Sequence, residues 1–241
     1  MRLGQLLCAA LVVAMLPAMA KPAIEIIPLR NGEAIGIPMQ ILLLLTALTL
    51  LPAVLVSLTP FLRIVVVLHF LRQALGTQST PSNQVLTGLA LFLTILLVQP
   101  TAMNVYTNAW QPLEKGEIEG LEAWQKASAP VRAFLLKFTR EKDLRLLVEI
   151  TKTPPPKNSS ELELTVIAPA YILSELKAGF QIGAVLFLPF LIIDLVIASL
   201  TLAVGMVQLP PALLSAPFKI MLFVLIDGWN LVIGSLVRSF G

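Results

Sequence analysis

Ionisable side chains lie inside the apolar runs of this sequence, and their types and spacing limit the chemistry that the chain could perform. In residues 59–81, TPFLRIVVVLHFLRQALGTQSTP, the side chains of Arg63, His69 and Arg72 are surrounded by Val, Leu and Phe. A charge at membrane depth is costly, so it usually has a partner or a function. On a helix, Arg63 and Arg72 would point to opposite faces. Three roles stay open for them: pairing between subunits, contact with lipid headgroups, and lining of a pore.

The second half of the chain carries a further set of charges in apolar surroundings, which are Glu175, Lys177, Asp194, Lys219 and Asp227. Glu175 and Lys177 are two residues apart, a spacing that does not allow pairing on one helix. Lys219 and Asp227 are eight residues apart and would share one helical face. We expect all five, like the two arginines above, to form charge contacts between subunits.

Enzymatic chemistry has little support in the sequence. One cysteine, Cys8, and one histidine, His69, exclude an internal disulfide and a Cys/His zinc site. The chain lacks a G-x-S-x-G motif, and Ser/His/Asp chemistry would depend entirely on His69. We therefore expect a protein that is not an enzyme and has no metal or cofactor, with His69 packed in the protein or at an interface. A proton relay through Asp194 and Asp227 is the less favoured alternative.

The composition is typical of a membrane protein. Hydrophobic residues make up 57% of the chain and charged residues 13%, against roughly 45–50% and about 25% in soluble domains. The mean hydropathy is +0.87. The net charge of +3 is small and unclustered, which argues against a nucleic-acid partner.

The N-terminus, MRLGQLLCAALVVAMLPAMA, has the pattern of a secretory signal. A basic start precedes a short apolar run and an A-x-A ending, which predicts cleavage after Ala20. The alternative is a first membrane helix that stays in place, but the run is short for a span of about 20 residues. Residues 21–38 would then form an extended segment outside the inner membrane, in the periplasm of a Gram-negative host.

Four uncharged or nearly uncharged segments are long enough to be membrane helices. They cover residues 39–58, 85–105, 182–205 and 212–237. We expect a first apolar helical hairpin at 39–105, a polar and mostly helical periplasmic insert at 106–180, and a second apolar hairpin at 181–241.

Local patterns refine this all-α membrane fold. Residues 131–150 have the apolar spacing of one amphipathic helix within the insert. Prolines inside or beside the apolar segments predict helix breaks, and these are Pro52, Pro100, Pro189, Pro210 and Pro211. The loop that contains Arg63 and Arg72 has no acidic residue, so the positive-inside tendency places it in the cytoplasm.

Three long stretches closely resemble the FliP family of flagellar biosynthesis proteins, which is related to the SctR family of injectisome secretion systems. They are TPFLRIVVVLHFLRQALGTQSTPSNQVLTGLALFLT, AYILSELKAGFQIGAVLFLPFLIIDLVIASL and PPALLSAPFKIMLFVLIDGWNLVIGSLVRSF. The resemblance covers roughly residues 40–105 and 140–240.

The resemblance implies a core subunit of the flagellar type III export gate in the bacterial inner membrane, at the flagellar basal body. About five copies would assemble with FliQ and FliR into a closed ring around a pore for unfolded flagellar proteins. FlhA and FlhB would work beside this gate, and lipids would surround it. The resemblance also implies bent helical hairpins that are buried in protein as much as in lipid, where broken helices are tolerated.

The resemblance also suggests where the pore would be narrowest. FliP-like chains usually carry a run of methionines between a glycine and two prolines, and flexible methionines can fill an irregular gap. Here the glycine and prolines are present, but only one methionine remains in the loop. We expect the constriction to be formed by Met206, Val207, Gln208 and Leu209, since apolar side chains can close a pore by packing and dewetting.

A small secondary transporter is the alternative function. Its interrupted helices would provide a midplane binding site at Asp194. The long polar insert and the lack of a convincing inverted repeat argue against this reading.

Overall fold

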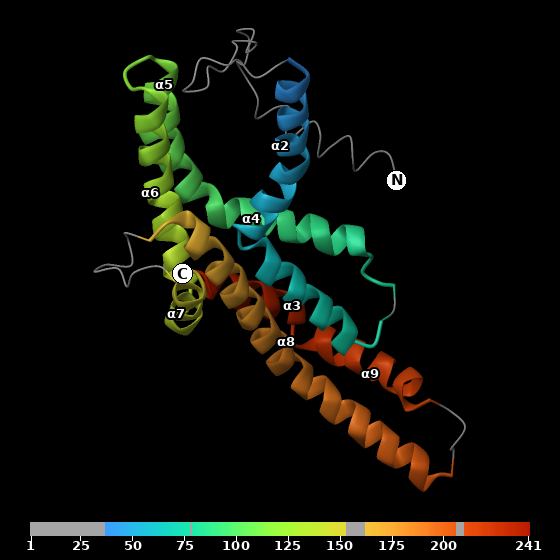
Figure 1. Ribbon diagram of the computed structural model, residues 1–241. Coiled ribbons are helices and arrows are strands. Elements are labelled where there is room, and N and C mark those ends of the chain that lie inside the picture. The colour runs from blue at the N-terminus through green and yellow to red at the C-terminus, as the bar shows by residue number, and fades with distance from the viewer. Residues whose placement is uncertain (1–36, 78, 153–161, 206–209) are drawn as a thin grey trace. The chain divides into compact units, whose positions relative to one another are not determined.

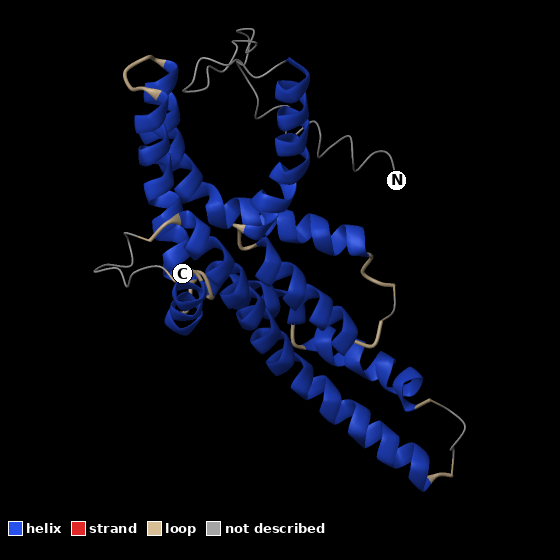
Figure 2. Cartoon of the chain, in the orientation of Figure 1, coloured by secondary structure: helices blue, strands red, loops and turns tan. Residues whose placement is uncertain are grey.

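The computed structural model describes residues 37–77, 79–152, 162–205 and 210–241. Within these ranges the regular elements are all helices and no strand is present (Figure 2). The prediction of an all-α protein is therefore confirmed. The predicted signal at residues 1–20 and the predicted constriction at 206–209 lie outside the described residues.

The elements follow one another along the described chain as a series of helices of very different length. They are α2 (Ile37–Ser57), α3 (Phe61–Ala74), α4 (Asn83–Val105), the π-helical stretch η1 (Tyr106–Trp110), α5 (Gln111–Glu114), α6 (Gly120–Phe138), α7 (Glu141–Ile150), α8 (Leu164–Ala203), α9 (Pro211–Leu225) and α10 (Gly228–Arg238).

Local sequence accounts for two of the helix starts. Ser82 is extended at the N-cap of α4, and its hydroxyl accepts a hydrogen bond from the backbone N–H of Val85 at 3.4 Å. Such a cap satisfies one of the free donors at a helix start. Helix α9 begins at Pro211, directly after Pro210. Proline suits this first position because its fixed φ is helical and its missing N–H is not needed there.

The chain divides into two compact units, residues 1–52 and 53–241. The first contains most of α2, whose described side chains up to Leu51 are all exposed. Leu44, for example, is 68% exposed. A helix that is apolar on every side is normally covered by lipid or by other protein.

The second unit is organised around α8. This helix has 40 residues, which corresponds to a length of about 60 Å. Figure 1 shows α3 running beside α8, and α3, α6, α7 and α9 all contact α8. The main hydrophobic core collects buried side chains of α3, α4, α8, α9 and α10, among them Leu68, Leu71, Leu86, Phe190 and Leu236. A second cluster joins α6 and α8 through Leu135, Ile167 and Tyr171.

Two helical stretches, Asn83–Glu114 and Leu164–Ala203, are long and apolar enough to cross a membrane. Two interrupted pairs, α2 with α3 and α9 with α10, also qualify when each pair is taken as one span. By length and composition, the described chain therefore has two to four candidate spans.

The predicted helix breaks are only partly right. Pro210 and Pro211 do mark the start of α9, but Pro52, Pro100 and Pro189 lie inside the continuous helices α2, α4 and α8. A proline removes one hydrogen bond of a helix, and the remaining bonds carry the helix through when neighbouring packing or an apolar setting favours it.

The predicted ends of the polar insert, at positions 106 and 180, do not coincide with the ends of helices. At the first boundary α4 continues directly into η1, so positions 105 and 106 lie in one helical run. At the second, positions 180 and 181 both lie inside α8. The expected single helix over 131–150 is two helices, since α6 ends at Phe138 and α7 begins at Glu141. Backbone hydrogen bonding does not follow the polarity of side chains, so a change in composition need not end a helix.

Candidate functional site: ion pairs along the central helix

Three residues of α8, Glu175, Lys177 and Asp194, each form an ion pair with a different neighbouring helix. All three are charged residues in apolar surroundings, which is why we expected them to have partners. The structure shows what each of them holds in place.

Glu175 and Arg63 form a buried, bidentate ion pair between α8 and α3. The Nε of Arg63 donates to Oε2 of Glu175 at 3.0 Å, and its Nη2 donates to Oε1. Nη1 donates to the hydroxyl of Ser239 at 3.0 Å, and the guanidinium lies 3.9 Å from the ring centroid of Phe240. The two charged side chains are 7% and 0% exposed. Because both carboxylate oxygens and the cation are satisfied, this pair connects α3, α8 and the C-terminal residues.

Lys177 pairs with Asp143 of α7 as part of a small polar network. The hydroxyl of Ser174 donates to Asp143 Oδ2 at 2.9 Å and accepts the backbone N–H of Arg140 at 2.9 Å. Arg140 lies in the gap between α6 and α7, so this network fixes the point at which the chain leaves one helix and begins the next. Burial alone would raise the pKa of Asp143. Hydrogen bonds from Lys177 and Ser174 and the charges of Lys177 and Arg140 outweigh it and hold this pKa below its ordinary value.

Asp194 and Lys219 join α8 to α9 on either side of residues 206–209. The Nζ of Lys219 donates to Asp194 Oδ2 at 2.6 Å, and the hydroxyl of Ser215 donates to Oδ1 at 2.5 Å. Lys219 is 4% exposed at its side chain and Asp194 is 32% exposed. A buried ammonium without this partner would be strongly destabilising, so the pair holds the two helices of this hairpin together.

These partners correct the expectation that the charges pair between subunits. Five of the seven residues, Arg63, Glu175, Lys177, Asp194 and Lys219, have their ion-pair partner within the same chain. The partners are separated by 112, 34 and 25 residues. Helical spacing describes only neighbours on one helix, so it could not reveal pairs between helices so far apart in sequence.

Arg72 and His69 have local contacts near the end of α3. Arg72 donates to the side-chain oxygen of Asn83, which ties α3 to the start of α4. His69 is half-buried, and its Nδ1 lies 2.9 Å from the carbonyl oxygen of Val65 in its own helix. Both line a pocket of about 430 Å³ with Gln73, Gly76 and Thr77. Whether Arg72 also contacts another subunit stays a prediction.

Asp227 lies at the break between α9 and α10 rather than on a continuous helix with Lys219. Its backbone is left-handed, with φ of 51°, and the two helices are bent by 67°. Asp is one of the few non-glycine residues that adopt this conformation readily. A Cβ added at Gly228 would lie 2.2 Å from the ring of Phe223, so the residue after Asp227 must be glycine. A contact of Asp227 with another subunit stays a prediction.

Two glycines of α8, Gly179 and Gly183, are contact positions that we did not predict from the sequence. A Cβ at Gly183 would lie 2.6 Å from the ring of Phe70, and one at Gly179 would lie 3.1 Å from Val66. Both contacts are with α3. The signal was present as a G-x-x-x-G spacing, which allows two helices to approach closely in a membrane.

Metal chemistry has no evident site in the described part of the chain. Groups of three or more His, Cys, Asp and Glu side chains that could hold a metal ion are absent there.

Comparison with known proteins identifies relatives over most of the chain. The family described as the FliP family matches residues 44–236. The flagellar biosynthetic protein FliP of Pectobacterium carotovorum is 48% identical, with 91% of this chain and 85% of that protein covered. The protein of the same name from Bacillus subtilis is 46% identical, with 90% of this chain and 98% of that protein covered. The one from Caulobacter vibrioides is also 46% identical, with 96% of this chain and 88% of that protein covered. The resemblance seen in the sequence is thereby confirmed, and the chain belongs to the FliP family.

Proposed function

We propose that this chain is a core subunit of the flagellar type III protein export gate. It would assemble in about five copies with FliQ and FliR and form the pore through which unfolded flagellar proteins leave the cell. FlhA and FlhB would work beside it. Membership of a family of flagellar biosynthetic proteins and the candidate membrane helices support an inner-membrane location at the flagellar basal body.

The observation that carries this proposal is the hairpin of α8 and α9. Two apolar helices are fastened to each other by Asp194, Lys219 and Ser215, with residues 206–209 at the connection between them. An internal ion pair of this kind holds the two helices together, while their outer faces stay available for neighbours. A loop that closes a pore would need its two flanking helices to be held in this way.

The exposed apolar surface supports assembly with other subunits. Leu195 of α8, Leu213 of α9 and Leu225 of α9 are 68%, 70% and 75% exposed. Many other large apolar side chains of α8 and α9 are exposed as well, and exposed apolar surface of such extent marks contact with protein or membrane. Since most of the buried charges discussed above are already paired within the chain, these outer faces offer mainly apolar contacts to FliQ, FliR and further copies.

Assembly is tested by native mass spectrometry on the tagged protein, extracted gently from the membranes of its own host. We expect a complex of several copies with FliQ and FliR. A monomer or simple dimer that persists across mild detergents would contradict the proposal. N-terminal analysis of the same sample tests the predicted cleavage, with a mature chain that begins at Lys21 as the expected result.

The constriction is tested by replacing Met206, Val207, Gln208 and Leu209 with glycine. We expect cells that carry this variant to become leaky to ions and small solutes, because glycines cannot fill the opening. The control is the conservative variant Gln208→Met, which keeps a side chain that can fill the opening and should leak no more than the wild type. An unchanged leak in the four-glycine variant would remove the constriction from this loop.

The transporter alternative would need the carboxylate of Asp194 free for a substrate. In the structure both oxygens of this carboxylate accept hydrogen bonds, from Lys219 and Ser215. This geometry favours a positioning role for Asp194 in the hairpin.

A further inference from the structure

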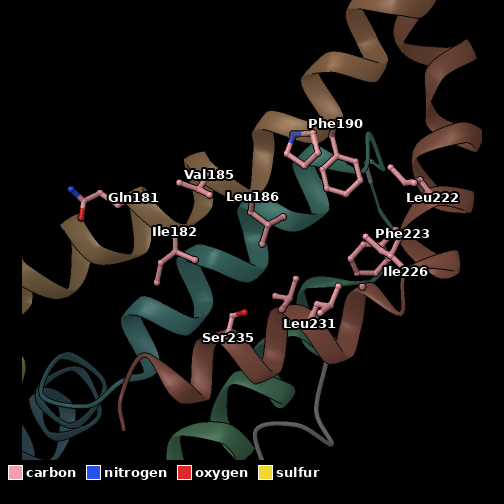
Figure 3. Close-up of a pocket in the computed structure, with 13 residues that line it drawn as sticks. Gln181, Ile182, Val185, Leu186, Phe190, Leu222, Phe223, Ile226, Leu231 and Ser235 are labelled. Carbon is pink, nitrogen blue, oxygen red and sulfur yellow. The ribbon is translucent and has the colours of Figure 1, made fainter.

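A groove between α8, α9 and α10 has the character of a ligand site that the proposed function does not use. Its volume is about 480 Å³, within the range of small-molecule sites. Figure 3 shows the side chains of Ile182, Leu186 and Phe190 from α8 and those of Phe223 and Leu231 facing it. Its lining is apolar except for two residues, Gln181 and Ser235.

The groove is polar at one end and apolar along the rest of its length. Gln181 lies at the end away from Phe190 (Figure 3). Gln181 follows Lys177 by one helical turn, and α8 has no charged residue from there to Asp194. From Gln181 to Phe190 the helix rises about 13 Å. This matches the depth of one leaflet, about half of the 30 Å hydrocarbon core.

Two arginines lie close to the polar lining residues of the groove. The guanidinium of Arg140 donates a hydrogen bond to the side-chain oxygen of Gln181. Arg238 is exposed and lies one helical turn after Ser235 on α10. Lys177 is 48% exposed at its side chain, and its charge is balanced by Asp143. The two arginines therefore leave an excess of positive charge beside the polar end of an apolar groove.

We propose that this groove binds one acyl chain of an anionic phospholipid, with the lipid headgroup at Arg140 and Arg238. The apolar length accepts the chain, and the arginines select the headgroup, since each basic residue near an anionic lipid surface strengthens binding by about 1 kcal/mol, or about five-fold. This lipid site goes beyond the role of the chain in export and does not depend on it.

The test uses the fluorescence of Trp229 in the full chain. Its ring centroid lies 5.4 Å from that of Phe223, which lines the groove. The chain has three tryptophans, so W110F and W124F leave Trp229 as the reporter. The protein is reconstituted in phosphatidylcholine vesicles that contain brominated-chain phosphatidylglycerol or, in parallel, brominated-chain phosphatidylcholine. Bromine quenches the indole only when the acyl chain is close to it.

We expect phosphatidylglycerol to quench Trp229 at a mole fraction about five-fold or more below that needed for phosphatidylcholine. R140Q with R238Q should reduce this preference to within about two-fold. The matched control is R145Q, which removes an exposed arginine of α7 that pairs with Glu141; it should keep the preference. V185F should weaken quenching by both lipids, because it fills the groove from a side chain that is largely exposed.

Three results would overturn the proposal. Equal quenching of the wild type by both lipids would exclude headgroup selection, and an undiminished preference in the R140Q/R238Q variant would exclude the two arginines. Absence of quenching by either lipid would mean that protein, such as another copy of the chain, covers the groove. Because FliQ and FliR are not needed for this measurement, its failure would leave the export proposal standing.

Discussion

The two halves of α8 have opposite relations to the rest of the chain. The first half is held from several sides, by the Arg63–Glu175 and Asp143–Lys177 pairs and by the close contact of Gly179 with α3. The second half is held mainly by α9 and the Asp194 pair, and it exposes a row of large apolar side chains, among them Leu195, Leu200 and Leu202. One helix thus serves as an internal support at one end and as an outer surface at the other.

Because of this difference, we expect substitutions in the two halves of α8 to have different effects on folding stability and on assembly. Substitutions in the first half should act on the folding of the isolated chain. Substitutions in the second half should act more on the hairpin and on what surrounds it. The following predictions test that contrast.

The largest effect is expected at the buried Arg63–Glu175 pair. E175Q removes the charge that compensates Arg63, and breaking such a buried pair typically costs about 3–5 kcal/mol. We expect a large drop in the thermal unfolding midpoint of the detergent-solubilised protein. The midpoint is measured as the temperature at which heating removes half of the monodisperse peak in size-exclusion chromatography. The control is E141Q, since Glu141 is exposed and its pair with Arg145 is exposed too.

A double variant sharpens this prediction. R63M with E175L removes both charges and retains apolar volume, which is often neutral or stabilising at a buried pair. The double variant should therefore be more stable than E175Q. If E175Q unfolds at the temperature of the wild type, the pair does not support the first half of α8.

The next effect is expected at the α8–α9 hairpin. D194N leaves Lys219 buried without a negative partner, which should destabilise the chain by about 2 kcal/mol. This is less than for E175Q because Asp194 is partly exposed. Flagellar protein export, measured as secreted hook or filament protein, should fall further than stability alone explains. S199A on the same half of α8 is the control. If D194N and E175Q lose export in the same proportion to their loss of stability, the two halves of α8 do not differ in the predicted way.

A comparable or smaller effect is expected where α8 meets α3. G183A places a methyl group 2.6 Å from the ring of Phe70, and overpacking of this kind costs roughly 1–3 kcal/mol. G179A meets Val66 at 3.1 Å, which a small shift can relieve, so it should cost less. The same unfolding assay compares them, with G234A as control because its added Cβ meets nothing within 4 Å. Equal costs for all three would contradict the close approach of the two helices.

The smallest effect is expected for the pH dependence of Asp143. Its pKa is lower in the folded chain than the ordinary value of 3.8. The folded state therefore binds fewer protons than the unfolded state in acid. Stability from this group is fully present above about pH 4, and it is lost as the pH falls through the lower, folded-state pKa.

Hydrogen exchange in α7, measured between pH 3 and pH 6 with correction for the intrinsic rate, checks this sign. Protection of α7 should weaken toward the acid end in the wild type. In D143N this pH-dependent part should be absent, while the protection is lower throughout. A wild type whose α7 becomes better protected in acid would reverse the predicted direction.

Much of the fold could be predicted from the sequence. Long apolar runs such as residues 182–205 exclude strands by their length and predict helices, and the structure confirms them. The charged residues were recognisable because they are rare in such runs. The partners were not, because Arg63 and Glu175 meet across 112 residues and no local pattern encodes that distance. The left-handed break at Asp227 was missed for a related reason, since one backbone angle at an ordinary-looking residue determines it.

The sequence by itself determined the class of protein, its family and the positions of charged residues in apolar segments. These follow from composition and from long stretches that match the family. Only the tertiary structure decided which charges neutralise each other, that α8 continues through Pro189, and that Gly179 and Gly183 face α3. The physical reason is that a buried charge is stabilised by a partner that is close in space, and that the packing around a helix determines whether it continues or breaks. Residues that are neighbours along the chain specify neither the partner nor the packing.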